Sequence, residues 1–288
     1  MERENKMKKY LLIFASILLI TSIACSFSVD VPKVKTGDTK LMEISEAIPA
    51  DQENGKVSIF MGGGTLAINP GENDWVTGTV EYNVPIWSPE ITRQGKSLEI
   101  SQETKDNLSF PSEKVKNDWQ INIGMFPTDL VIKAGAYQGQ LQLGGIPLTS
   151  LEINDGASQA DVVFDKENPV VMSTLIYKTG ASQINLEGLG YANAESISFD
   201  GGAGSYTFDF SGQLQRDLDV SINYGLGDVK IIIPKGVPAV VSVEGGLNNV
   251  ELFGTWNIQG NDYELAGTGP KITFVVKMGL GNLQLISR

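Results

Sequence analysis

The feature that most constrains the fold of this chain is a glycine that recurs at a nearly constant spacing. Seven glycines, separated by 21, 24, 22, 23, 21 and 33 residues, can be placed in one register, and an eighth copy lies upstream. The eight turn glycines are Gly62, Gly135, Gly156, Gly180, Gly202, Gly225, Gly246 and Gly279. Repetition of this kind in a chain of 288 residues predicts one supersecondary unit that is stacked several times.

Apolar and polar residues alternate on both sides of each glycine. Positions three and five residues before it, and four and six residues after it, are apolar in nearly every copy, as Ile222 and Val229 are around Gly225. A period of two predicts two short, half-buried strands joined at the glycine. The sequence therefore predicts an all-β, single-domain β-solenoid of stacked coils of about 22 residues over 126–288. An ordinary β-sandwich is the alternative fold.

Two further expectations follow from the repeat. Glycine would recur because each coil turns there with a positive φ, and each coil would stack on the coil before it in sequence. The position three residues after the glycine is mostly an amide or a short polar side chain, which predicts hydrogen bonds from coil to coil. That position holds Gln138, Gln159, Gln183, Ser205, Asp228, Asn249 and Asn282.

The regular copies are flanked by segments that hold all four tryptophans. Residues 55–125 are expected to form an N-terminal β region with the first coil and a cap, and Thr255–Lys271 is an insert in the last repeat. These aromatic residues either close the ends of the core or form a binding surface for a partner. The candidate binding residues are Trp75, Trp87, Trp119, Trp256 and Tyr263.

The N-terminus has the organisation of an export signal. A basic stretch precedes the uncharged apolar run Tyr10–Ala24, which is short for a membrane-spanning helix, and Cys25, the only cysteine of the chain, follows it. This resembles a bacterial lipoprotein signal, with 1–24 removed and Cys25 lipidated, although Ser22 stands where leucine is usual. A plain signal peptide or an uncleaved anchor is the alternative. Residues 25–54 are polar and are expected to be a tether with at most one short structured piece, Thr39–Ile48.

Composition narrows the chemistry. The chain has no histidine, which removes imidazole bases and most zinc sites, and its formal net charge is −12, which disfavours nucleic acid as a partner. We expect no cofactor, no metal site and no catalytic residues.

Two kinds of site are weaker alternatives. Asp155, Asp200, Asp228 and Glu244 lie near turn glycines, and Asp200 and Glu244 would be two coils, or about 9.6 Å, apart. That spacing is at the outer limit for an inverting glycosidase, and isolated acids beside glycine are typical of solvated turns. Calcium binding would need a regular aspartate at each turn, which the repeat lacks.

The sequence also resembles a known bacterial family. The stretch Gly227–Val250 and the ending Met278–Leu283 resemble the C-terminal domain of LiaF-like proteins, the cell-wall-active antibiotic response family. Trp119–Leu130, with the Gly-Ala pairs that follow it, is similar to the toast-rack domain, which is related to β-solenoid adhesins. Thr79–Leu98 is similar to the N-terminal part of that domain.

The resemblance implies an envelope protein, in some members connected with envelope stress, and it supplies no catalytic residues. The sequence thus predicts a non-enzymatic, lipid-anchored interaction or scaffold module on the extracytoplasmic face of a membrane. Its partner would be an envelope protein or a glycan, besides the membrane bound through Cys25. A surface adhesin or glycan-binding protein, and a degenerate polysaccharide-active enzyme, are the alternative functions.

Overall fold

The computed structural model describes residues 35–50, 52–102 and 115–288, and within them the chain is almost entirely β-structure. The N-terminal strands are β1 (Lys40–Glu46), β2 (Gly55–Pro70), β3 (Val76–Tyr82), β4 (Pro89–Gln94), β5 (Ser97–Gln102) and β6 (Asn117–Ile123). The repeat strands are β7 (Thr128–Gln142), β8 (Leu148–Val163), β9 (Leu175–Glu187), β10 (Ser196–Asp209), β11 (Leu218–Ile233), β12 (Ala239–Phe253) and β15 (Ile272–Ser287). Two short strands, β13 (Asn257–Gln259) and β14 (Asp262–Leu265), and two 3-10 turns, Pro85–Trp87 and Leu189–Tyr191, complete the described elements.

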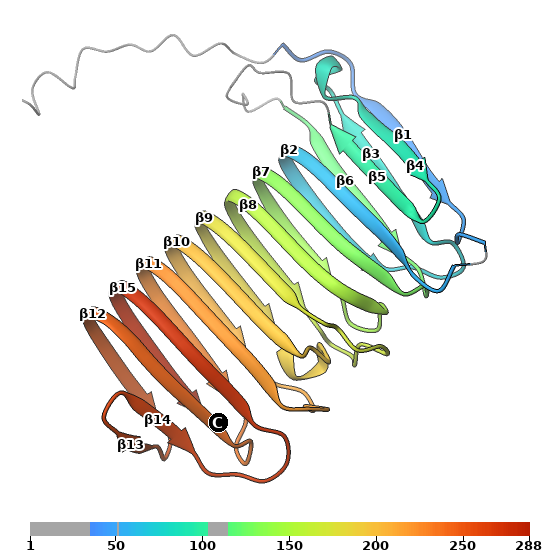
Figure 1. Cartoon of the computed structure of the whole chain (residues 1–288). Coiled ribbons are helices and arrows are strands. Elements are labelled where there is room, and N and C mark those ends of the chain that lie inside the picture. Colours follow the sequence, from blue (N-terminus) through green and yellow to red (C-terminus); the bar gives the residue numbers. More distant parts are fainter. Residues whose placement is uncertain (1–34, 51, 103–114) are drawn as a thin grey trace, which may run out of the picture. The chain divides into compact units, whose positions relative to one another are not determined.

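Each long strand is one coil of a solenoid, and it bends at its turn glycine. We call the residues before the glycine the first arm and those after it the second arm. Successive coils pair in parallel along both arms, as Ile197 with Val220 and Tyr206 with Val229 do between β10 and β11. Figure 1 shows the bent strands side by side. The all-β solenoid that the alternating pattern predicts is confirmed.

The core lies between the two arms. Phe199 of the first arm of β10 packs against Phe208 of its second arm, with ring centroids 5.0 Å apart and an interplanar angle of 87°. Both side chains are fully buried. This edge-to-face geometry is favourable for aromatic rings, so the two apolar columns of each coil stabilise one another across the coil.

One coil stacks out of sequence order. The C-terminal strand β15 lies between β11 and β12, because Val229 pairs with Leu283 and Leu283 pairs with Val250. The expectation that each coil stacks on the one before it in sequence is therefore wrong at this place. All coils share the same apolar columns, so the pattern is satisfied equally well by either order.

Hydrogen bonds to the neighbouring connections hold β15 in its place between β11 and β12. Lys271 donates its N–H to Asp217 Oδ1 at 2.8 Å, and its carbonyl accepts from Leu218 N at 2.9 Å. On the other side, Ile272 N donates to Pro238 O at 3.0 Å. The start of β15 is thus held between the start of β11 and the end of the β11–β12 connection.

At the N-terminal end the two arms of β2 have separate partners. Lys56–Phe60 pairs in parallel with β5, whereas Thr65–Pro70 pairs in parallel with β6. Beyond them β4 pairs antiparallel with β5, and β3 and β1 continue the sheet from β6 with antiparallel pairing. β1 lies within Thr39–Ile48. Among the described residues no helix is long and apolar enough to cross a membrane.

Candidate binding furrow along the glycine corner

The bend at each glycine interrupts the alternation of side chains. In the ladder between β10 and β11, Gly201 pairs with Tyr224 and Ala203 pairs with Leu226, while the glycines between them have no paired Cα. The side chain two residues before the glycine and the side chain one residue after it both face outward. The glycine, which has no side chain, therefore lies between two columns of outward-facing side chains. The stacked glycines therefore form the floor of a furrow that crosses the strands.

The reason for glycine at the corner differs from the expected one. Backbone φ is not positive at Gly135, Gly156, Gly180, Gly202, Gly225 or Gly279; it is positive two residues later in three coils, at Gly64 (142°), Gly227 (139°) and Gly281 (148°). A Cβ on Gly156 would instead stand 2.8 Å from the carbonyl oxygen of Gly135 in the neighbouring coil. The prediction of a shared left-handed turn is wrong, and close approach of adjacent backbones is the physical cause.

Between β9 and β12 the furrow contains a pocket with a volume of about 630 Å³. Its polar side is a row in the stacking order Asp200, Asn223, Lys277, Glu244. Asn223 Nδ2 donates to Asp200 Oδ1 at 2.9 Å, and Lys277 Nζ lies 3.5 Å from Glu244 Oε2. Leu226 and Leu280, which directly follow two of the floor glycines, are 51% and 50% exposed and pair with one another.

The strand order separates the two carboxylates that the sequence placed two coils apart. Asn223 and Lys277 both lie between Asp200 and Glu244, so the separation is three strand spacings, or about 14 Å. That exceeds the ~6.5–9.5 Å of an inverting glycosidase. Asp200 and Glu244 therefore do not form an acid–base pair.

The other two acids, Asp155 and Asp228, accept hydrogen bonds from side chains of the stacked coils. Asp155 accepts hydrogen bonds from Tyr177 Oη at 2.8 Å, from Ser158 Oγ at 2.9 Å and from Thr179 Oγ1. Burial raises the pKa of the Tyr177 phenol, so it remains a neutral donor to this carboxylate. Asp228 accepts from Asn282 Nδ2 at 2.7 Å in the coil-to-coil ladder. Across the described residues, His, Cys, Asp and Glu side chains form no cluster of three suited to a metal ion.

The predicted ladder three residues after the glycine is present where β11, β15 and β12 meet. Asn282 bridges the other two coils, since it donates to Asp228 and its Oδ1 accepts from Asn249 Nδ2 at 3.4 Å. A second ladder, five residues after the glycine, was not predicted. There Asn185 Nδ2 donates to Asp161 Oδ1 at 2.7 Å, and Gln284 Nε2 donates to Glu251 Oε2 at 2.9 Å.

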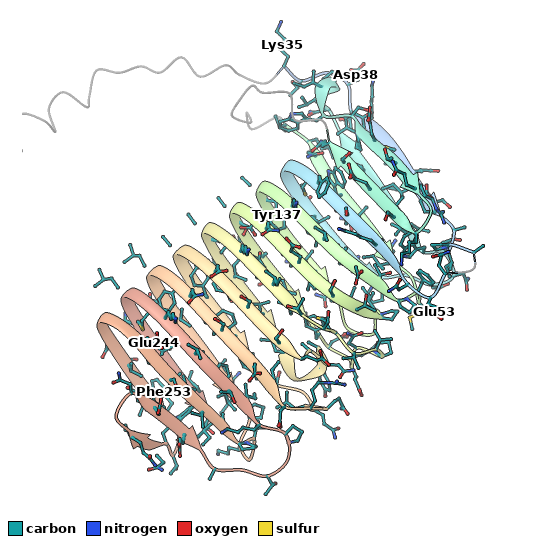
Figure 2. All side chains as sticks on the ribbon, in the orientation of Figure 1. Lys35, Asp38, Glu53, Tyr137, Glu244 and Phe253 are labelled. Carbon is teal, nitrogen blue, oxygen red and sulfur yellow. The ribbon has the colours of Figure 1, made fainter. Side chains whose placement is uncertain are left out.

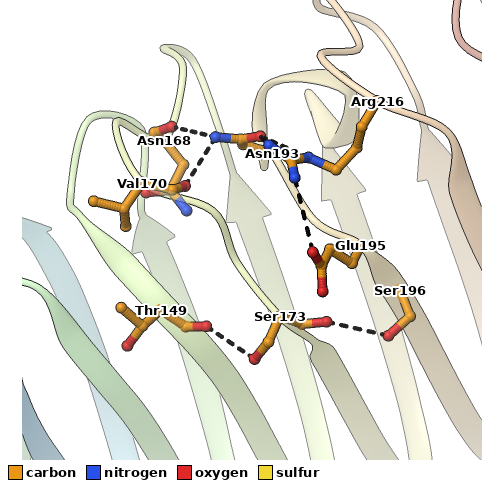
Figure 3. Close-up of polar contacts among 8 residues, drawn as sticks. All are labelled: Thr149, Asn168, Val170, Ser173, Asn193, Glu195, Ser196 and Arg216. Atoms are coloured by element: carbon orange, nitrogen blue, oxygen red, sulfur yellow. Dashed lines mark hydrogen bonds and ion pairs between the residues drawn. The ribbon is translucent and has the colours of Figure 1, made fainter.

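A third group of polar contacts lies among the connections between coils (Figure 3). Asn193, which has a φ of 53°, donates to the carbonyls of Asn168 and Val170 at 3.1 and 2.9 Å and accepts from Arg216 Nη2 at 2.8 Å. Asn168 is fully buried, and its amide bridges the Leu148 and Ala192 backbones. These contacts fasten one connection to the next, which is a structural role.

The tryptophans do not form one binding surface. Trp75 and Trp119 are fully buried; Trp75 Nε1 donates to Thr128 Oγ1 and Trp119 Nε1 to Asn117 Oδ1, both at 2.9 Å. These two are therefore corrected from binding residues to core residues, because their rings close the core near β2. Trp87 is half-buried at the β4–β5 end of the sheet.

The remaining two candidate aromatics, Trp256 and Tyr263, are half-buried against the core at the opposite end.

The sequence analysis missed Asn223, Lys277 and the glycine floor as a joint feature. The polar column two residues before the glycine was the signal for it. Figure 2 shows the side chains along the strands, with Glu244 labelled at the β12 end.

The chain is similar to several solved structures. No curated protein matches the chain. Among solved structures, a putative cell adhesion protein from Clostridium sporogenes is 18% identical with a TM-score of 0.45, covering 87% of this chain and 99% of that one. A putative adhesin from Parabacteroides merdae is 12% identical with a TM-score of 0.39, covering 89% and 98%. A putative lipid binding protein from Parabacteroides distasonis is 11% identical with a TM-score of 0.35, covering 87% and 97%.

A family model matches more than half of the chain. It describes the N-terminal domain of toast_rack, DUF2154, and matches residues 32–173 and 167–232, which include β1 to β10 and most of β11. The match agrees with the bent parallel coils described above. This chain belongs to the toast_rack family.

Proposed function

We propose that this protein is a non-enzymatic interaction module of the cell envelope that binds an extended glycan in the furrow. The observation that carries the proposal is the row Asp200, Asn223, Lys277 and Glu244 beside a floor of bare glycines. Successive side chains in this row come from adjacent strands, so hydrogen-bonding groups repeat every ~4.8 Å along a straight line.

A glycan suits such a furrow for two reasons. Its hydroxyl groups both donate and accept, which matches a row of carboxylate, amide and ammonium groups. Its sugar rings also have apolar faces, and Leu226 and Leu280 offer exposed apolar surface next to the floor glycines. This binding role matches the adhesin or glycan-binding alternative of the sequence analysis.

The binding test uses the detergent-solubilised full chain and purified peptidoglycan in a sedimentation assay. Asn223→Ala and Lys277→Ala should each weaken binding at least fivefold. Asn154→Ala is the matched control, because Asn154 occupies the same column in β8, outside the 630 Å³ pocket of the furrow. Equal binding by all four proteins, or none by the unaltered protein, contradicts a peptidoglycan site in the furrow. Release of soluble fragments would assign the chain to the enzymes instead.

The anchoring part of the proposal concerns Cys25, which lies outside the described residues. We propose that residues 1–24 are removed, that the thiol carries lipid, and that 25–54 contains the tether to the extracytoplasmic face of the membrane. Cys25→Ala should move the protein from the membrane to the soluble fraction or leave an unprocessed precursor. Unchanged membrane retention with a normal mature mass contradicts lipidation.

A role in envelope-stress sensing is the second candidate. The resemblance of Gly227–Val250 to the LiaF-like family favours it, and these residues include most of β12 and part of the furrow. If the furrow senses envelope glycans, Lys277→Ala should alter the response of an envelope-stress reporter while the level of the protein stays constant. A reporter response equal to that of the unaltered protein contradicts this role.

A further inference from the structure

The last coil of the stack is covered along only one of its arms. β12 pairs with β15 along both arms, but on its other side β14 pairs only with Ala239–Ser242. No described strand pairs with the outer edge of Asn249–Phe253. In the described part of the stack, every other repeat strand has a partner on both sides of its second arm. An unpaired edge of this kind is a template for another strand.

The core is open at the same place. Val250 and Leu252 are only half-buried, whereas the equivalent side chains of the two preceding coils in the stack are 0–1% exposed. Those equivalents are Val229, Ile231, Leu283 and Leu285. The first arm is closed, since Val241 and Ala239 are at most 1% exposed beneath the β13–β14 hairpin. The hairpin thus closes half of the coil.

We propose that a second copy of this chain covers the open half, with the second arms of the two β12 strands paired antiparallel about a two-fold axis. The occupant must supply a strand edge and two apolar side chains on its core face, and the second copy offers both. Such a contact is self-complementary, as an isologous interface requires. It continues the sheet and places an apolar core-facing side chain of one molecule against that of the other.

The outward-facing polar residues favour one register. With Val250 on the axis, Asn249 of each chain lies opposite Glu251 of the other, so an amide faces a carboxylate twice. With Glu251 on the axis, two like charges would be directly opposite, which is destabilising. Glu251 already accepts hydrogen bonds from side-chain amides, at 3.1 Å from Asn249 and at 2.9 Å from Gln284, so this position suits amide partners.

The first experiment measures self-association of the detergent-solubilised full chain by analytical ultracentrifugation. We expect a monomer–dimer equilibrium, with the dissociation constant raised at least tenfold by Val250→Lys. Ile258→Lys is the matched control, because Ile258 lies on β13 at the same end and is 55% exposed; it should change the constant less than twofold. A monomer at every concentration, or equal effects of the two variants, overturns the proposal.

A second experiment guards against loss of folding in Val250→Lys. In a Cys25→Ala background, Val250→Cys should form a disulfide-linked dimer under mild oxidation, since directly opposed antiparallel residues lie within the Cα separation that a disulfide tolerates. Ile258→Cys should not. Failure of Val250→Cys to cross-link in a protein that dimerises shows that another surface is used and overturns the register.

Discussion

The carbonyl oxygen of Gly202 lies 2.8 Å from the position that a Cβ atom on Gly225 would occupy. The two glycines are equivalent positions of adjacent coils, so this approach is a direct consequence of stacking coils at the corner. Even one methyl group at Gly225 would push two neighbouring backbones apart.

Gly225→Ala is therefore expected to destabilise the protein by at least ~1 kcal/mol, through the Cβ itself. Because the methyl group of alanine already causes the clash, the stability lost in Gly225→Ala should be most of the stability lost in Gly225→Val. Chemical denaturation of the full chain measures both. Gly37→Ala is the control: its Cβ would meet its nearest neighbour, Pro85, at an ordinary 3.6 Å, and it should be nearly neutral. Equal stabilities of the Gly225→Ala and Gly37→Ala proteins would contradict the close-approach explanation.

The strand order β11–β15–β12 predicts which cysteine pairs can be oxidised. In a Cys25→Ala background, Asp228→Cys with Asn282→Cys should form a disulfide, because these residues are paired on adjacent strands. Asp228→Cys with Asn249→Cys should not, since β15 separates them and the Cα atoms are about 9.6 Å apart. Non-reducing electrophoresis distinguishes the two, and the reverse result would restore the order of the sequence.

Tyr206 and Tyr177 differ in hydrogen bonding, so removing each hydroxyl group should change the stability of the fold differently. Tyr206 Oη is buried and has no partner among the described residues, so Tyr206→Phe should be neutral or stabilise the fold by up to ~1 kcal/mol. Tyr177 Oη donates to Asp155, so Tyr177→Phe should destabilise it by ~1–3 kcal/mol. Urea denaturation midpoints measure both. Stability lost equally in the two variants would contradict this difference in hydrogen bonding.

Alkaline pH should unfold the protein through its buried phenols. Burial raises the pKa of Tyr137 and of Tyr177, so above pH ~10 the unfolded chain releases these protons while the folded chain retains them. Their contribution to stability is fully present below pH ~10 and is lost as the pH rises above it. Phenolate absorbance should rise together with loss of circular dichroism. Ionisation of these tyrosines in a folded protein at pH ~10 would contradict the prediction.

The class of fold follows from the amino-acid sequence alone. Period-two alternation around Gly180 or Gly225 depends only on which residues of one strand face inward, and hydrophobic burial enforces that choice in every coil. The polar position three after the glycine likewise predicted the ladder through Asn282, because equivalent residues of stacked coils must be neighbours.

Other features depend on which strand lies beside which, and these are visible only in the tertiary structure. The apolar columns are interchangeable, so no local pattern shows that β15 enters between β11 and β12, and the separation of Asp200 from Glu244 depends on that order. The same holds for the tryptophans: a large amphipathic side chain such as Trp119 is equally suited to a surface or to a core end, and only the strands packed around it settle which. Glycine at the corner was visible in the sequence, but its cause, the carbonyl of the adjacent coil, belongs to a contact between residues more than twenty positions apart.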